Sequence, residues 1–159
     1  MAIYIKYGAL KGEVTAQGYT DYFEATSLQY GVGRGISMGA GGGSKREATA
    51  PSVSEIQVSK TLDAISPFLY KEALGGKGSD VEIHLTQTDD GGKHIPFQIF
   101  KLNGTLISGY SMSSGGDRPT ESLSFNFAKI ESTYMKIDEK FKSEKAGTVI
   151  YDLAKALLS

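Results

Sequence analysis

The two histidines are the first residues to test for chemistry, because two carboxylates lie between them in the sequence. His84 and His94 fall on the two arms of an expected β-hairpin, with Asp89 and Asp90 at its tip. Proximity across the hairpin could bring them together as a His₂–carboxylate metal site. Asp-Asp-Gly-Gly is more typical of a tight turn, since Asp and Gly tolerate the backbone angles that turns require. We therefore predict a turn here, with neither a metal site nor any other cofactor.

Glycine-rich segments are the next candidates, since 20 of the 159 residues are Gly and such loops can hold phosphate. The segments are GVGRG at 31–35, GAGGGSKR at 39–46 and GGKG at 75–78. None has the Gly-Lys-Ser/Thr ending of a phosphate-binding loop, and none lies between an expected strand and an expected helix. The sequence also contains no Cys, which removes thiol chemistry. These observations predict surface loops in a protein that is not an enzyme.

The charge balance excludes several classes of partner. Lys and Arg number 17 and Asp and Glu number 18, which gives a net charge of −1. This balance argues against binding to nucleic acid or to anionic membranes through charge. Apolar runs stay well short of the roughly 18 residues of a membrane span, so we expect no membrane insertion. The opening residues MAIYIKYGALK alternate and include Lys6, unlike a signal peptide, so we expect a cytoplasmic start.

Apolar periodicity predicts an all-β domain over residues 1–159 with one short helix. Ser66 suits the N-cap of that helix, Pro67 its first position and Gly75 the position past its end. Its buried stripe would consist of Phe68, Leu69, Ala73 and Leu74. Strands are expected at Ile3–Tyr7, Tyr22–Val32, Val53–Ser59, in a hairpin over 81–100, at Leu106–Met112, and from Leu123 onward with a bulge near Lys129. Such a set indicates an antiparallel sandwich or barrel.

The expected strand Tyr22–Val32 has two distinct faces. Leu28, Tyr30 and Val32 share one face and are assigned to the core. Ser27 and Gln29 must then point the other way, together with Ala25.

Two connections and two ambiguous segments complete the chain. Residues 36–51 are Gly-rich, carry adjacent cations and have no apolar period, so we predict a long exposed loop. Residues 139–147 (EKFKSEKAG) form a charged connection. The final stretch TVIYDLAKALLS fits either a helix or a strand, and Asn103-Gly104 is either a tight turn or an irregularity within one long strand.

Several motifs in order resemble the haemolysin-coregulated protein (Hcp) family, the tube subunit of the bacterial type VI secretion system. IYIKYGALKGEVT resembles the opening strand of the family, and SLQYGVGRGISMGAGGG resembles the strand that runs into its Gly-rich loop. SEIQVSKTLDAISPFLYKEALGGK resembles the block that carries Lys60, Asp63 and the short helix. GYSMSSGGDRPTESLSFNFAKIESTY is the most specific stretch, through Asp117, Glu121, Asn126-Phe127 and Tyr134. YDL at 151–153 resembles a closing strand.

The resemblance implies a β-barrel of two antiparallel sheets flanked by one helix. It implies a homohexameric ring with an open channel, stacked into a tube that a contractile sheath surrounds and a spike tips. It also implies export without a signal peptide, with small effector proteins carried inside, and no catalysis. The edge residues Ile36, Ser37, Met38, Lys45 and Arg46 would dock the next ring. Ser27 and Gln29 become candidates for the wall of the channel.

Two other functions remain open at this stage. A monomeric β-barrel that binds a small ligand or a carbohydrate would have the same strand pattern, and its oligomeric state would distinguish it. A hydrolase or metalloenzyme would need a converging polar cluster, which the sequence does not assemble.

Overall fold

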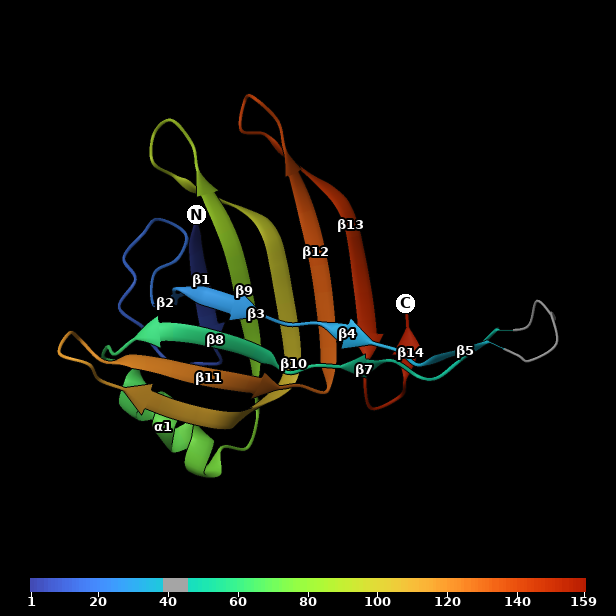
Figure 1. Ribbon diagram of the computed structural model, residues 1–159. Coiled ribbons are helices and arrows are strands. Elements are labelled where there is room, and N and C mark those ends of the chain that lie inside the picture. Colours follow the sequence, from blue (N-terminus) through green and yellow to red (C-terminus); the bar gives the residue numbers. More distant parts are fainter. Residues whose placement is uncertain (39–45) are drawn as a thin grey trace.

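The protein folds into two antiparallel β-sheets with one short helix, α1, at the end of their common core (Figure 1). The computed structural model describes residues 1–38 and 46–159. The elements are β1 Ala2–Tyr7, β2 Phe23–Ala25, β3 Ser27–Gln29, β4 Val32–Gly33, β5 Ile36–Met38, β6 Arg46–Ala48, β7 Ser52–Val53, β8 Ile56–Thr61, α1 Ser66–Gly75, β9 Ser79–Thr88, β10 His94–Ser113, β11 Thr120–Asn126, β12 Lys129–Ile137, β13 Ser143–Asp152 and β14 Leu157–Leu158.

One strand belongs to both sheets. The large sheet has the order β2-β1-β9-β10-β12-β13-β14, and the small sheet has the order β10-β11-β8-β3. The first half of β10 pairs with β9 and β12, and its second half leaves the large sheet to pair with β11. β10 therefore links the two layers covalently as well as through hydrogen bonds.

The question of Asn103-Gly104 is resolved by the path of β10. These residues lie inside the 20-residue strand, at an irregularity where the pairing with β9 skips from Leu102 to Thr105. Gly104 has φ +60°, a left-handed conformation that costs Gly little. The pair is thus a bulge that bends one long strand.

The core lies between the two sheets and is built from the alternating residues that face inward. On the large sheet these include Ile5, Ile83 and Leu102, and on the small sheet Ile56 and Phe125, all with no exposed surface. The expected hairpin over 81–100 is confirmed, with β9 and β10 paired around the turn at Asp89–Gly92. The expected closing strand is present as the end of β13, which stops at Asp152, so Leu153 already lies in the following turn.

The helix is present, but several details of its prediction were wrong. Gly75 is its last residue rather than the position past its end, and Gly76 is the C-cap. Ile65 rather than Ser66 is the N-cap, and the Asp63 carboxylate accepts a hydrogen bond from the Ile65 N–H at 3.2 Å. Ser66 is instead drawn into the core by other partners. Leu69 is fully buried, whereas Phe68 and Leu74 are 54% and 72% exposed, so the buried stripe is narrower than predicted.

The predicted closed barrel was wrong, because the sheets stay open. β2 ends at Ala25, the N–H of the next residue, Thr26, donates to the Ser59 carbonyl at 2.7 Å, and the chain then enters the small sheet as β3. At the other side β12 and β13 continue the large sheet beyond the small one (Figure 1). Among the described strands, none connects this outer part of the large sheet back to the small sheet.

The segment Tyr22–Val32 is not one strand, so its assigned faces need correction. The bend at Thr26 reverses the alternation, which buries Ala25 rather than exposing it. Leu28 packs against the core as predicted, but Tyr30 and Val32 are 42% and 65% exposed. The chain leaves the sheet after Gln29. Beyond that residue, the alternation of apolar residues no longer indicates which side chains face the core.

Three connections also differ from their predictions. Within segment 36–51, β5 pairs with β6 as a short ribbon, so this segment is not a simple loop. The flanking strands β4 and β7 pair as a second ribbon. Residues 143–147 of the charged connection already belong to β13, because exposed strand positions tolerate charge. Near Lys129 the inward-facing residues change from odd-numbered to even-numbered positions. The cause is the passage of the chain from β11 in the small sheet to β12 in the large one, and not a bulge.

The shared strand gives a direct test of the core. Leu102→Ala removes a fully buried side chain from β10 and should lower the free energy of unfolding by about 2–5 kcal/mol. Lys101→Ala, the matched control on the exposed face, should change it by less than about 0.5 kcal/mol. Urea denaturation of both variants measures this, and equal losses would contradict the assigned faces of β10.

Candidate interaction surfaces

A charged cluster is buried where β8, β11 and α1 meet. Lys60 and Glu121 have no exposed surface, and the Lys60 Nζ lies 2.9 Å from the Glu121 Oε1. The same ammonium lies 2.8 Å from the Asp63 Oδ1 and donates to the Ser66 Oγ at 3.1 Å. The Ser66 hydroxyl in turn donates to Glu121. The Lys60 ammonium also lies 5.7 Å from the centre of the Phe23 ring, which is a favourable cation–π distance.

The environment of Glu121 favours its charged form. Burial by itself would raise the pKa of the Glu121 carboxyl, but the hydrogen bonds from Ser66 and Lys60, together with the nearby Tyr110 hydroxyl, outweigh it and hold that pKa below its usual value. Burial, with a smaller effect of the Glu121 carboxylate, raises the pKa of the Tyr110 hydroxyl to about 12. The cluster is thus a structural ion pair that ties the helix to the small sheet. The sequence analysis named members of this cluster in two separate motifs, but it did not predict that they pair.

The outer face of the small sheet is uncharged and polar, and it contains Ser27 and Gln29. Both residues are exposed on β3. Ser27 pairs in register with Ser59, Ser59 with Ser122, and Ser122 with Ser111, so hydroxyls cross four strands in one row. The next row runs from Gln29 through Gln57 to Ser124 and Gly109. We call these two rows the polar wall. The sequence analysis did not predict the polar-wall residues on β8, β10 and β11. Their alternation with buried apolar residues could have identified them.

The β5–β6 ribbon carries the residues that were predicted to contact the next ring. Ile36 is 55% exposed and pairs with Ala48, while Met38 pairs with Arg46 through the backbone. Ser37 lies between them, Arg46 is exposed, and Lys45 lies outside the described residues. Residues 35–39 read Gly-Ile-Ser-Met-Gly, the spacing of a nucleophile elbow, but Ser37 lies in a ribbon strand and not at a strand-to-helix turn.

The two histidines have separate partners rather than a common one. The His84 Nδ1 lies 3.0 Å from the Tyr19 hydroxyl, and the His94 Nε2 lies 3.2 Å from the Tyr4 hydroxyl. A hydrogen bond from His84 lowers the pKa of the Glu82 carboxyl. The His84–Tyr19 contact fastens the segment 10–22 to the large sheet, whereas the His94–Tyr4 contact lies within that sheet, between β10 and β1. Within the described residues, no group of three or more His, Cys, Asp or Glu is arranged to hold a metal ion.

The described residues include no helix with the length and hydrophobicity needed to cross a bilayer.

Comparison with protein families decides the assignment. The family described as "Type VI secretion system effector, Hcp" matches residues 4–134, which is most of the chain. The chain belongs to the Hcp family. The match includes the buried cluster and ends at Tyr134, before β13 begins. Hcp is a family of structural secretion proteins and not an enzyme family. No curated protein matches the chain in sequence.

Solved structures of Hcp proteins share this fold along the whole chain. A type six secretion system protein is 23% identical, with a TM-score of 0.88 over 99% of both chains. Hcp1 from Salmonella typhimurium is 17% identical, with a TM-score of 0.76 over 99% of this chain and 98% of its own. A type VI secretion system effector from Yersinia pestis is 20% identical, with a TM-score of 0.71 over 94% of this chain and 98% of its own. At these identities the likeness concerns the fold.

The buried cluster predicts a specific loss of stability in acid. Because the pKa of Glu121 is lower in the folded chain than in the unfolded one, its stabilisation is complete above about pH 4.5 and is lost as the pH falls below that value. Glu121→Gln cannot ionise and leaves Lys60 without this partner, so it should cost about 3–5 kcal/mol of unfolding free energy at pH 7.

Urea denaturation at several pH values measures both effects. The difference between the wild type and Glu121→Gln should shrink as the pH falls below 4.5. Glu139→Gln, at an exposed hairpin turn, serves as the control and should differ little from the wild type at any pH. A difference for Glu121→Gln that stays constant down to pH 3 would contradict the assigned pKa direction.

Proposed function

We propose that this chain is the subunit of the inner tube of a type VI secretion system. The observation that carries the proposal is the Hcp family match over residues 4–134. Identical subunits form a hexameric ring with an open channel, and the rings stack into a tube. The subunit is cytoplasmic before assembly, and the assembled tube is secreted. Its partners are a spike, a contractile sheath and small effector proteins.

The polar wall supports a role as the lining of the channel. Hydroxyl and amide groups of Ser27, Gln29, Gln57, Ser59 and Ser122 present donors and acceptors without a fixed charge. Such a surface offers many weak hydrogen bonds to a passing protein, and no charge that would select strongly for acidic or basic cargo. A channel that must hold and later release different effectors needs these properties.

The first test is the oligomeric state of the purified protein. Native mass spectrometry and negative-stain microscopy should find a hexameric ring with a central opening. A protein that stays monomeric at high concentration would contradict the proposal and favour a monomeric ligand-binding protein.

The channel assignment is tested by Gln29→Arg, which places a fixed charge on the polar wall. Rings should still form, because Gln29 is exposed and lies outside the core. The set of small proteins that copurify with affinity-tagged rings from secretion-competent cells should change. Gln17→Arg, at an exposed position of segment 10–22, is the matched control and should leave this set unchanged. Identical sets for all three proteins would show that the polar wall does not meet cargo.

The ribbon assignment is tested by Arg46→Glu. Exposed ion pairs each contribute only about 0–1 kcal/mol, but every subunit of a ring repeats the contact, so the effects multiply. Rings should persist while tube growth at high protein concentration and secretion both fall. Lys11→Glu reverses an exposed charge elsewhere and should leave both unchanged. Tubes of normal length in Arg46→Glu would show that this cation does not contribute to stacking.

A further inference from the structure

The large sheet is wider than the small one, so part of its core-facing side is left without a second layer. Ile130 on β12 lies at the edge of the core. Its pairing partner Tyr151, on the next strand β13, points to the same side of the sheet. Val149 and Ser132, paired in the next row, continue this face. The β4–β7 ribbon crosses above it, and between them lies a groove of about 640 Å³. We call this the wing groove.

The wing groove is mostly apolar and open to solvent, although the charged Arg34 also lines it. Val32 from the ribbon is 65% exposed, Val149 from the sheet 55%, and Leu158 from β14 66%. Tyr30 lies at its inner end with its ring 5.0 Å from that of Phe100. A contiguous exposed apolar surface of this kind marks a site of association.

A second apolar surface lies on α1. Pro67, Tyr70 and Leu74 follow the spacing i, i+3, i+7, so they form one stripe along the helix. Tyr70 and Leu74 are 50% and 72% exposed, and Met112 beside them is 55% exposed. We call this the helix stripe.

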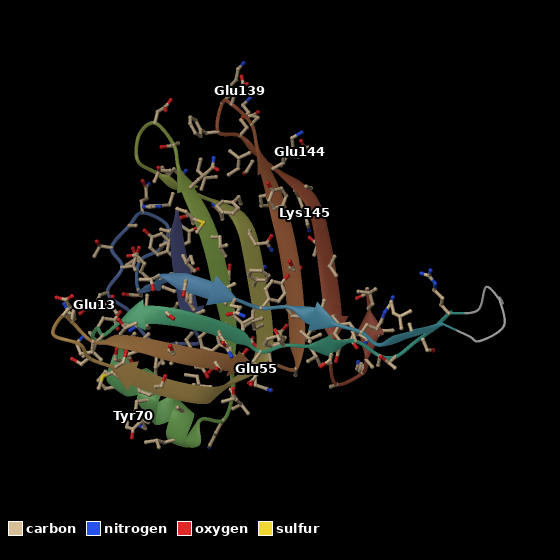
Figure 2. The ribbon with its side chains drawn as sticks, in the orientation of Figure 1. Glu13, Glu55, Tyr70, Glu139, Glu144 and Lys145 are labelled. Carbon is tan, nitrogen blue, oxygen red and sulfur yellow. The ribbon has the colours of Figure 1, made fainter. Side chains whose placement is uncertain are left out.

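The two surfaces lie at opposite ends of the molecule. In Figure 1, α1 lies at the lower left while β4, β7 and β14 lie at the right. Figure 2 labels Tyr70 on the same end as α1, away from the wing groove. One chain therefore cannot bring its own helix stripe into its own wing groove.

We propose that the helix stripe of one copy occupies the wing groove of the next copy, and that this is the contact between neighbouring subunits of the ring. The inference rests on the proposed function, because it specifies the subunit contact of that ring. A convex helix fits a concave groove, whereas two grooves facing each other would leave both unfilled. Two different surfaces on opposite ends of a subunit give a head-to-tail contact, which closes into a ring when the rotation is suitable.

A second copy suits the wing groove better than an unrelated partner. Of the 13 large apolar side chains exposed on the described part of the chain, seven belong to these two surfaces. A foreign partner in the wing groove would leave the helix stripe uncovered, whereas self-association covers both. The net charge of −1 offers no repulsion between copies.

Two single substitutions separate the surfaces. Leu74→Glu places a charge on the helix stripe, and Leu158→Glu places one in the wing groove. Both positions are exposed, so circular dichroism and the urea midpoint of the monomer should stay unchanged. Each variant should run as a monomer in sizing with light scattering at concentrations where the wild type is a ring. Gln17→Glu, outside both surfaces, should remain a ring.

Mixing the two variants tests the head-to-tail arrangement. Leu158→Glu keeps an intact helix stripe and Leu74→Glu keeps an intact wing groove, so an equimolar mixture should contain one intact contact per pair. The mixture should therefore form heterodimers and no rings. If either variant fails to fold, Tyr70→Glu or Val149→Glu replaces it on the same surface.

The remaining outcomes each decide against the inference. Rings in both variants would overturn it while leaving the proposed function intact. Dissociation of Leu158→Glu alone would mean that something other than the helix stripe fills the wing groove, and a mixture that stays monomeric would exclude the head-to-tail contact. A wild type that is itself monomeric would remove the proposed function as well.

Discussion

The fold depends on a single strand that serves two sheets. β10 is 20 residues long, and the bulge at Asn103-Gly104 and the irregularity before Gly109 let it leave the large sheet and enter the small one. Because both layers contain this strand, they must diverge from it at a fixed angle, with the core between them. The strands beyond β10 in the large sheet, β12 and β13, then extend past the small sheet and leave their inner face uncovered. This uncovered inner face forms the sheet side of the wing groove.

The buried Lys60–Glu121 pair holds the other end of the core. Removing either charge alone leaves its partner buried without compensation, so the pair is costly to break, although its net contribution to stability can be small. Its value lies in geometry, since the pair, Asp63 and Ser66 fix where α1 begins and therefore which side of the helix faces outward. The exposed stripe Pro67, Tyr70 and Leu74 follows from that anchoring.

The sequence predicted the features that depend on local pattern and missed those that depend on tertiary context. Alternation located β1, β9 and the hairpin at Asp89–Gly92, and the Hcp resemblance is confirmed over residues 4–134. The strand expected at Val53–Ser59 is instead divided into β7 and β8. The alternation of apolar residues wrongly placed Tyr30 and Val32 in the core, because it cannot show that the chain leaves its sheet at Gln29. Ser66 has the chemistry of an N-cap, but a buried carboxylate and ammonium compete for its hydroxyl. The barrel stayed unclosed because strand order and register, rather than strand content, decide closure.

The most direct test of the account is a map of the assembled protein by electron cryomicroscopy at a resolution that separates strands. The account predicts a hexameric ring whose opening is lined by the outer face of β3, β8 and β11, with the polar wall facing the channel. It also predicts α1 of each subunit against β4, β7 and β14 of its neighbour. A ring with the polar wall on its outer surface, or a protein that forms no ring, would contradict it.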